Sequence, residues 1–311
     1  MAEKHEYLLP RDFEESVRYV DEPIPRFSFL GASSIVKDQL LMKRLRLTAQ
    51  HYLWTQHQGY HIHPSVGFPS SGDIQIADIA CGNCLWLLDS RNSTTDAFQA
   101  TWTGFDISDA QFPKEALLPS NVFLRTLDIY DVPSDLHGKF DLIHLRMLGF
   151  GVRDSDPIPV LRTLLALLKP GGWLQWDEAD HEFDPPNAAP GTSNARMQEL
   201  QKAIRTSVFK GAPAFGWTKN LLDSFRSAGF TAVVEDKHPI ERTALKYWTE
   251  LQLQAFASGL KVLAQNPAQD AVRREAAEKI LEKFPAAIAE AKEGGAFCLW
   301  PKVVLGRKSP S

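Results

Sequence analysis

Cysteine is scarce in this chain of 311 residues, and neither a long apolar run nor an excess of positive charge is present. Three cysteines are too few for a disulfide framework and favour a reducing compartment. No apolar run approaches the roughly 20 residues that a membrane-spanning helix needs, and the start of the chain is too polar for a signal peptide. The formal net charge of −4 offers no basic surface for nucleic acid. We therefore expect a cytoplasmic protein that binds neither nucleic acid nor membranes.

A glycine-rich phosphate loop is also missing, although one segment is typical of the start of a nucleotide-binding unit. Residues 74–88, IQIADIACGNCLWLL, predict a strand, a tight turn of small residues and the start of a helix. Such a turn lets a ligand approach the backbone and the free N–H groups of the helix start. Gly82 is the only glycine in this turn, so the GxGxxG fingerprint of nicotinamide and flavin enzymes is absent. The pattern favours a nucleoside ligand without a pyrophosphate group, such as S-adenosylmethionine.

An acidic residue at the next predicted strand end supports a nucleoside ligand. Asp106 closes the apolar segment 102–106 and follows Gly82 at close to the spacing of about 20 residues expected for an acid that binds ribose hydroxyls. Two carboxylates at successive strand ends, Asp78 and Asp106, would then face one ligand.

The order of the predicted elements indicates an α/β protein with a doubly wound parallel sheet. Strands are predicted near residues 74–79, 102–106, 122–127, 139–146, 173–176, 231–235 and 297–305. Helices are predicted over 34–54, 195–208, 218–228, 245–263 and 272–288, and from a cap at Asp154 or Asp156 to Leu168. We expect Thr218 to cap its helix and Pro285 to kink the last one.

Five segments in this order resemble landmarks of the class I S-adenosylmethionine-dependent methyltransferases: ADIACGNCLW (77–86), GFDIS (104–108), NVFL (121–124), FDLIHLR (140–146) and LKPGGW (168–173). The preceding segment RLTAQHYLW (46–54) adds a resemblance to the fungal methyltransferases of secondary metabolism, the group related to the regulator LaeA and to gliotoxin-type N-methyltransferases. The resemblance covers roughly residues 40–180. It implies a Rossmann-like sheet of seven strands with the last strand antiparallel, and S-adenosyl-L-methionine as the cofactor.

The resemblance implies that the cofactor-binding residues lie at the strand ends and on the preceding helix: Asp78, Ala80, Gly82, Asp106, Ile107, Asp128, Ile129, Leu145, Arg146 and His51. The first turn would hold the methionine part, Asp106 the ribose, and Asp128 with Ile129 the adenine. The family usually has glycine where Ala80 and Cys84 stand. We expect Ala80 to adopt a negative φ at little cost and Cys84 to narrow the methionine pocket.

Candidate catalytic residues follow the later strands. Methyl transfer from a sulfonium depends mainly on positioning, and an oxygen or sulfur acceptor also needs a base that works near neutral pH. His144 and His181 each follow a predicted strand at the ligand edge, and the resemblance implies that residues 144–146 lie under the methyl group. Glu178 together with Asp177 could instead orient a cationic amine. A structural role is the alternative for each of them.

The spacing of Cys81 and Cys84 is that of CxxC zinc and redox sites. Zinc needs four ligands, and Cys298 is the only other cysteine. Both residues also lie inside the predicted ligand turn, so we predict no metal site.

Residues 1–71 are expected to form an N-terminal arm and a covering helix, and residues 72–311 the methyltransferase domain. Insertions 181–217 and 241–293 would form a substrate lid whose aromatic residues favour an apolar ligand. The expected function is methyl transfer to an oxygen, nitrogen or sulfur atom of a small secondary metabolite. A pericyclase-like cyclisation or elimination and a non-catalytic regulator similar to LaeA stay open as alternatives. The expected partner is a small molecule, and a homodimer is one candidate for the oligomeric state.

Overall fold

The computed structural model describes residues 32–70, 72–94, 99–180, 189–207, 216–237, 240–265, 271–297 and 300–310. Contacts divide the chain into two units, Met1–Met42 and Lys43–Ser311. The boundary falls within helix α2 (Ala32–Gln58), so the described part of the first unit is the beginning of that helix. The sheet and its surrounding helices lie in the second unit, and the domain boundary expected at residue 71 stays a prediction.

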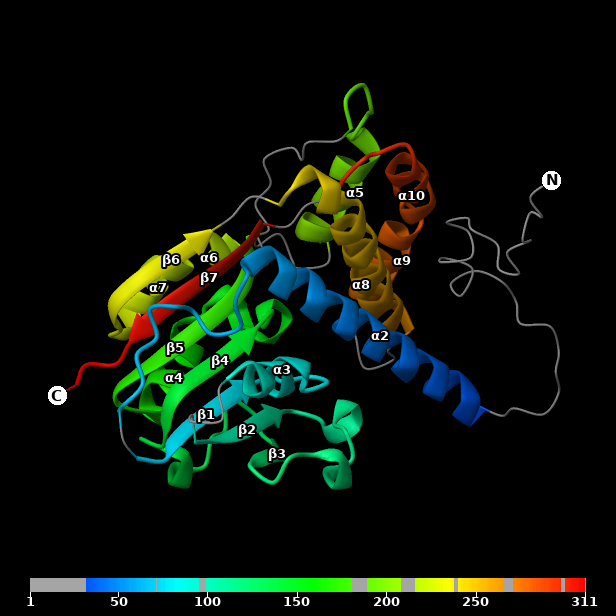
Figure 1. Cartoon of the computed structure of the whole chain (residues 1–311). Coiled ribbons are helices and arrows are strands. Elements are labelled where there is room, and N and C mark those ends of the chain that lie inside the picture. Colours follow the sequence, from blue (N-terminus) through cyan, green and yellow to red (C-terminus); the bar gives the residue numbers. More distant parts are fainter. Residues whose placement is uncertain are drawn as a thin grey trace, which may run out of the picture. The chain divides into compact units, whose positions relative to one another are not determined.

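A seven-stranded sheet forms the centre of the second unit (Figure 1). The strands are β1 (Ile74–Ile79), β2 (Ala100–Asp106), β3 (Val122–Thr126), β4 (Phe140–Arg146), β5 (Leu168–Asp180), β6 (Thr231–Lys237) and β7 (Trp300–Arg307). Their order across the sheet is β3-β2-β1-β4-β5-β7-β6. The first five strands pair in parallel, and β7 runs antiparallel to both β5 and β6. The predicted doubly wound fold with an antiparallel last strand is confirmed.

Helices and short 3-10 turns connect the strands. The helices after α2 are α3 (Leu85–Ser93), α4 (Ile158–Leu167), α5 (Ala195–Ser207), α6 (Gly216–Lys219), α7 (Leu221–Ala228), α8 (Leu245–Gln265), α9 (Ala271–Leu281) and α10 (Phe284–Lys292). Within the described residues, none of the helices combines the length and the apolar character needed to cross a membrane.

Apolar side chains at alternating strand positions cover both faces of the sheet. On one face, Trp86 of α3 packs with Trp102 of β2. On the other, Leu164 of α4 and Phe225 of α7 join a cluster with Trp176 of β5. Strand β4 is buried at every position except its last, as expected for a central strand of a parallel sheet covered on both faces.

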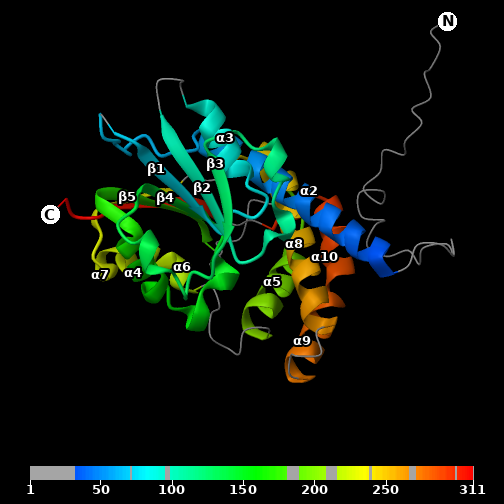
Figure 2. The same cartoon turned by 90° about the horizontal axis from the view of Figure 1, so that it is seen from below.

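A second apolar cluster lies beyond the carboxyl ends of β4 and β5 (Figure 2). It unites α5, α8, α9 and α10, and Trp54 of α2 is fully buried against Trp248 of α8, with ring centroids 5.6 Å apart. Met147, which follows β4, and Ala179 of β5 belong to the same cluster. These helices therefore stand at the edge of the sheet where the predicted ligand site lies.

Two local predictions are wrong. The single helix predicted over 272–288 is divided into α9 and α10, and Pro285 lies in the first turn of α10, where its missing N–H group has no intrahelical partner to lose. Thr218 lies inside α6 and does not cap α7, which begins after Asn220. The end of α7 agrees with the sequence, because Gly229 adopts a left-handed φ of 104° there.

Gly172 of β5 offers a test of how closely β4 and β5 approach. A Cβ atom at this position would lie 2.9 Å from the carbonyl oxygen of Phe140 and 3.1 Å from that of Lys169. Because backbone atoms cannot turn aside, Gly172→Ala should lower the free energy of unfolding by roughly 1–3 kcal/mol in urea titrations. Gly67→Ala is the control, since a Cβ atom there meets open space. Equal stabilities of the two variants would contradict this packing.

Candidate functional site

The turn between β1 and α3 has an unusual backbone. Ala80, Gly82 and Cys84 all adopt left-handed conformations, with φ of 57°, 55° and 63°. The expectation of a negative φ at Ala80 is therefore wrong, and a left-handed residue with a Cβ atom costs roughly 1–2 kcal/mol. Strain of this kind is typical of ligand sites, where the surrounding structure maintains it.

Asp106 at the end of β2 is tied to this turn. Its carboxylate accepts the N–H group of Gly82 at 2.9 Å and that of Ser108 at 3.2 Å. The next residue, Ile107, is 74% exposed. The structure thus brings Asp106 and Gly82 together, and it places an apolar side chain in solvent directly beside a half-buried carboxylate. This pair can offer an acceptor to sugar hydroxyls and an apolar surface to a base.

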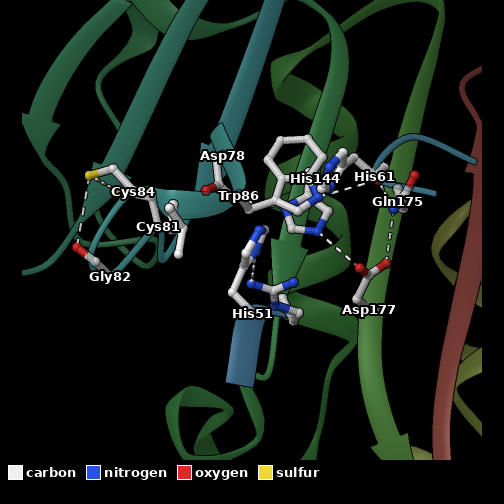
Figure 3. A network of polar contacts seen from close by, with 12 residues as sticks. His51, His61, Asp78, Cys81, Gly82, Cys84, Trp86, His144, Gln175 and Asp177 are labelled. Carbon is white, nitrogen blue, oxygen red and sulfur yellow. Dashed lines mark hydrogen bonds and ion pairs between the residues drawn. The ribbon is translucent and has the colours of Figure 1, made fainter. Parts of the chain in front are cut away.

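Three buried side chains form a row across three neighbouring strands (Figure 3). His144 of β4 places Nδ1 2.7 Å from Asp78 of β1 and Nε2 3.2 Å from Asp177 of β5. Trp86 stacks on the imidazole, with ring centroids 3.6 Å apart. Burial alone would lower the pKa of His144, but the two carboxylates outweigh it and raise that pKa. We call this group the acid–histidine row; a protonated His144 donates to both carboxylates.

The acid–histidine row continues into the segment that links α2 to β1. Gln175 of β5 donates from Nε2 to Asp177 at 3.0 Å and to the carbonyl oxygen of His61 at 2.9 Å. Its Oε1 accepts the N–H group of His63 at 2.8 Å. One buried amide therefore fixes two residues of the linking segment to the sheet, and Figure 3 shows Gln175 beside His61 and Asp177.

His51 of α2 connects α3 with β4. Its Nε2 lies 2.9 Å from Asp89 of α3, and its Nδ1 lies 3.1 Å from Nη2 of Arg146. A guanidinium can only donate, so Nδ1 accepts and Nε2 carries the proton that is donated to Asp89. Burial, reinforced by the charge of Arg146, lowers the pKa of His51 to about 4. His51 is therefore neutral at pH 7.

Sequence comparison shows similarity to fungal methyltransferases. No protein-family model matches the chain. It is 33% identical over 139 residues to the methyltransferase grgD of Penicillium sp., covering 42% of this chain and 46% of that protein. It is 28% identical over 183 residues to the methyltransferase psoC of Aspergillus fumigatus, covering 58% and 63% of the two chains. The chain thus spans about half to two thirds of the length of these relatives.

Similarity to solved structures is distant. A putative sarcosine dimethylglycine methyltransferase from Galdieria sulphuraria is 13% identical, with a TM-score of 0.46 over 76% of this chain and 78% of that one. The seven strands and the antiparallel β7 are what the sequence resemblance implied. In its sheet and in its sequence similarity to fungal methyltransferases, the chain resembles the class I methyltransferases.

Two residues predicted to flank an adenine lie after β3. Asp128 accepts the N–H group of Tyr130 at 2.9 Å and lies 3.5 Å from the exposed Arg153. Ile129 is 9% exposed and belongs to the core cluster of the sheet. Asp128 is accessible to a ligand, whereas Ile129 offers little free surface. Their contact with adenine stays a prediction.

The predicted catalytic residues differ in their surroundings. His144 is 1% exposed and both its ring nitrogens face carboxylates, so this geometry favours a positioning role over that of a base. Glu178 is fully buried and lies on the opposite face of β5 from Asp177, where it accepts from Trp176 Nε1 at 3.2 Å. Burial raises the pKa of Glu178 to about 7. His181 lies outside the described residues.

Sequence reasoning does not identify several residues of the candidate site. Asp89 and Gln175 were not singled out, because nothing in their local pattern separates them from ordinary polar positions. Gln111 was also missed: it is 7% exposed, and neither atom of its amide has a hydrogen-bond partner within the described residues. Such a buried amide needs an explanation, and Gln111 lies in the turn that follows Asp106 and Ile107. Among the described residues, no group of three metal-ligating side chains is arranged around a common point.

Replacing His144 should show how much the acid–histidine row contributes to the free energy of unfolding. His144→Phe keeps a ring on Trp86 but leaves Asp78 and Asp177 buried without their shared donor. We expect a loss of roughly 3–5 kcal/mol in the free energy of unfolding at pH 7, against less than about 0.5 kcal/mol for His137→Phe on the surface. Adding Asp177→Asn to His144→Phe should recover part of the loss. An unchanged stability of His144→Phe would disprove the role.

Titration of Glu178 gives a pH-dependent test. The pKa of Glu178 in the folded protein is about 7, above the ordinary 4.5. Between pH 4.5 and 7, Glu178 therefore holds a proton in the folded protein that it has released in the unfolded chain. The contribution of Glu178 to stability is therefore present below about pH 4.5 and is lost as pH rises through about 7. Relative to Glu178→Gln, the wild type should lose about 3 kcal/mol between pH 4.5 and 8 in urea titrations. Glu278→Gln, at an exposed position of α9, should show no such trend.

Proposed function

We propose that the chain binds S-adenosylmethionine at the carboxyl ends of β1, β2 and β4 and transfers its methyl group to a small apolar molecule. The observation that carries this proposal is the bond from Gly82 to Asp106 beside the exposed Ile107. It joins the strained first turn to an acid and an apolar surface of the kind that an adenosyl group requires. The unpaired amide of Gln111 in the next turn also suits a polar ligand.

The described part of α2 supplies a cover for the cofactor. Asn83 donates to Thr48 at 3.2 Å, and Arg44 donates to the carbonyl oxygen of Ala110 at 3.0 Å. Leu47 lies so close to Gly82 that a Cβ atom there would be 3.6 Å from its Cδ1. The helix therefore contacts the turns after both β1 and β2, and it can keep water from the cofactor.

The residues of this chain perform the positioning on which methyl transfer depends. When bound, the cofactor supplies an electrophilic methyl group on a sulfonium. Asp106 accepts from the ribose, Ile107 contacts the base, and the acid–histidine row keeps the ends of β1, β4 and β5 in register below the methionine part. Of the proposed acid–base residues, Glu178 has a pKa of about 7 and His181 lies outside the described residues, so a general base stays a proposal.

The acceptor is proposed to be apolar and bound beside the α5, α8–α10 cluster. Trp54, Met147 and Trp248 belong to this cluster at the ends of β4 and β5. Several relatives are N-methyltransferases, among them gliN of Aspergillus fumigatus at 30% identity over 177 residues, which supports a nitrogen acceptor and a place in fungal secondary metabolism. The scarcity of cysteine supports the cytoplasm. Nothing in the part of the chain that the structure describes favours a cyclase or a regulator.

Calorimetry with S-adenosylhomocysteine tests this proposal. We expect binding to the wild type, a roughly 10- to 100-fold weaker affinity for Asp106→Ala because hydrogen bonds to a charged group are lost, and no change for the exposed Asp109→Ala. Mass spectrometry of candidate acceptors should show the addition of one methyl group. Absence of binding to the wild type would reject the cofactor, and a product of unchanged mass would reject methylation.

A further inference from the structure

A hollow of about 550 Å³ lies against β2 and β3, the strand at one edge of the sheet (Figure 1). Thr103 and Phe105 of β2 share one face of the sheet. On β3, Phe123 and Arg125 pair with these two residues in turn. Because Phe105 packs in the core cluster of α4 and α7, this face is the one opposite α3. We call this feature the sheet-face hollow; its lining includes Phe105, Phe112, Glu115, Phe123, Arg125 and Lys139.

The connection between β3 and β4 leaves this part of the sheet without a covering helix. Parallel strands are usually joined by a crossover helix, but residues 127–139 contain only the 3-10 turn Ser134–Leu136. Among the residues that line the sheet-face hollow, only Phe105 and Phe140 belong to the core cluster of α4 and α7. The ring of Phe123 is consequently 52% exposed.

The sheet-face hollow carries more positive than negative charge. Arg125 and Lys139 line it together with one acid, Glu115. Both cations are exposed, and in the part of the chain that the structure describes no carboxylate lies within 4 Å of either of them. The guanidinium carbon of Arg125 lies 6.0 Å from the centroid of the Phe105 ring. The two cations are therefore available to an anion from outside the chain.

The lining side chains define the kind of ligand that fits. An arginine binds a planar acidic group through two parallel hydrogen bonds. Phe105, Phe112 and Phe123 supply ring surface for an aromatic ligand. The hydroxyls of Thr101 and Thr103 also line the sheet-face hollow, and neither has a hydrogen-bond partner among the described residues. A volume of about 550 Å³ is that of a site for one small molecule.

We propose that the sheet-face hollow is a second binding site, for a small aromatic anion such as an aryl carboxylate. Arg125 and Lys139 bind the acidic group, and Phe123 packs on the ring. None of the residues of the proposed cofactor site lines the sheet-face hollow. The inference therefore goes beyond the proposed function and does not depend on it.

Two fluorescent probes that differ in one acidic group test this site. 8-Anilinonaphthalene-1-sulfonate is an aromatic anion, and N-phenyl-1-naphthylamine has the same rings without the sulfonate. In fluorescence titrations of the full chain with S-adenosylhomocysteine present, the wild type should bind the anion roughly 10-fold more tightly than the neutral probe. Arg125→Gln combined with Lys139→Gln should remove this preference and change the affinity of the neutral probe less than about threefold. Arg162→Gln combined with Lys202→Gln, at exposed positions of α4 and α5, is the matched control and should keep the preference.

A Phe123 variant tests the apolar wall. Phe123→Ser should weaken both probes several-fold and to the same extent, whereas Val272→Ser, at a position of α9 that is 77% exposed, should change neither. All the substituted side chains are exposed, so the melting temperatures should match that of the wild type. Equal affinities of the wild type for the two probes, or an unchanged preference for the anion in the double variant of Arg125 and Lys139, would overturn the inference.

Discussion

The acid–histidine row is the interaction on which the rest of the site depends. Asp78, His144 and Asp177 come from β1, β4 and β5, and strand pairing places Asp78 directly beside His144. Charges this deeply buried need partners, because burying an unpaired ion costs several kcal/mol. A slip of one strand by a single residue would turn its charged side chain to the opposite face. The row therefore makes the observed register of these strands much more stable than a register shifted by one residue. The shape of the sheet edge is fixed with it.

Residues in and beside the acid–histidine row also attach α2 and the segment after it to the sheet. Asp177 shares Gln175 with His61, and Arg146, two residues after His144, contacts His51 of α2. The described part of α2 and the segment after it are consequently fixed at several points around the first turn. Opening of the site would break hydrogen bonds to buried groups, and for this reason we expect the cover to move as a unit with the linking segment rather than residue by residue.

The two faces of β5 have different neighbours. Gln175 faces the segment after α2 and bonds Asp177 on the same face, whereas Glu178 faces the α4 and α7 side with Trp176. Ala179 continues into the helical cluster with Trp248. One strand thus joins the cofactor edge, the sheet core and the apolar helices, which explains why it is longer than the four residues predicted from sequence.

The sequence by itself determined the class of sheet, the carboxyl ends of β1, β2 and β4, and the meeting of Gly82 with Asp106. These features follow from alternating apolar residues, from small residues at the first turn, and from the rule that parallel strands end at one edge of a sheet. Only the tertiary structure decided that His144 is enclosed by two acids and that Ile129 faces the core. It also decided the links from His51 to Asp89 and to Arg146, which are 38 and 95 residues away. Contacts across such separations depend on how helices and strands pack, and local sequence carries no periodic signal for them.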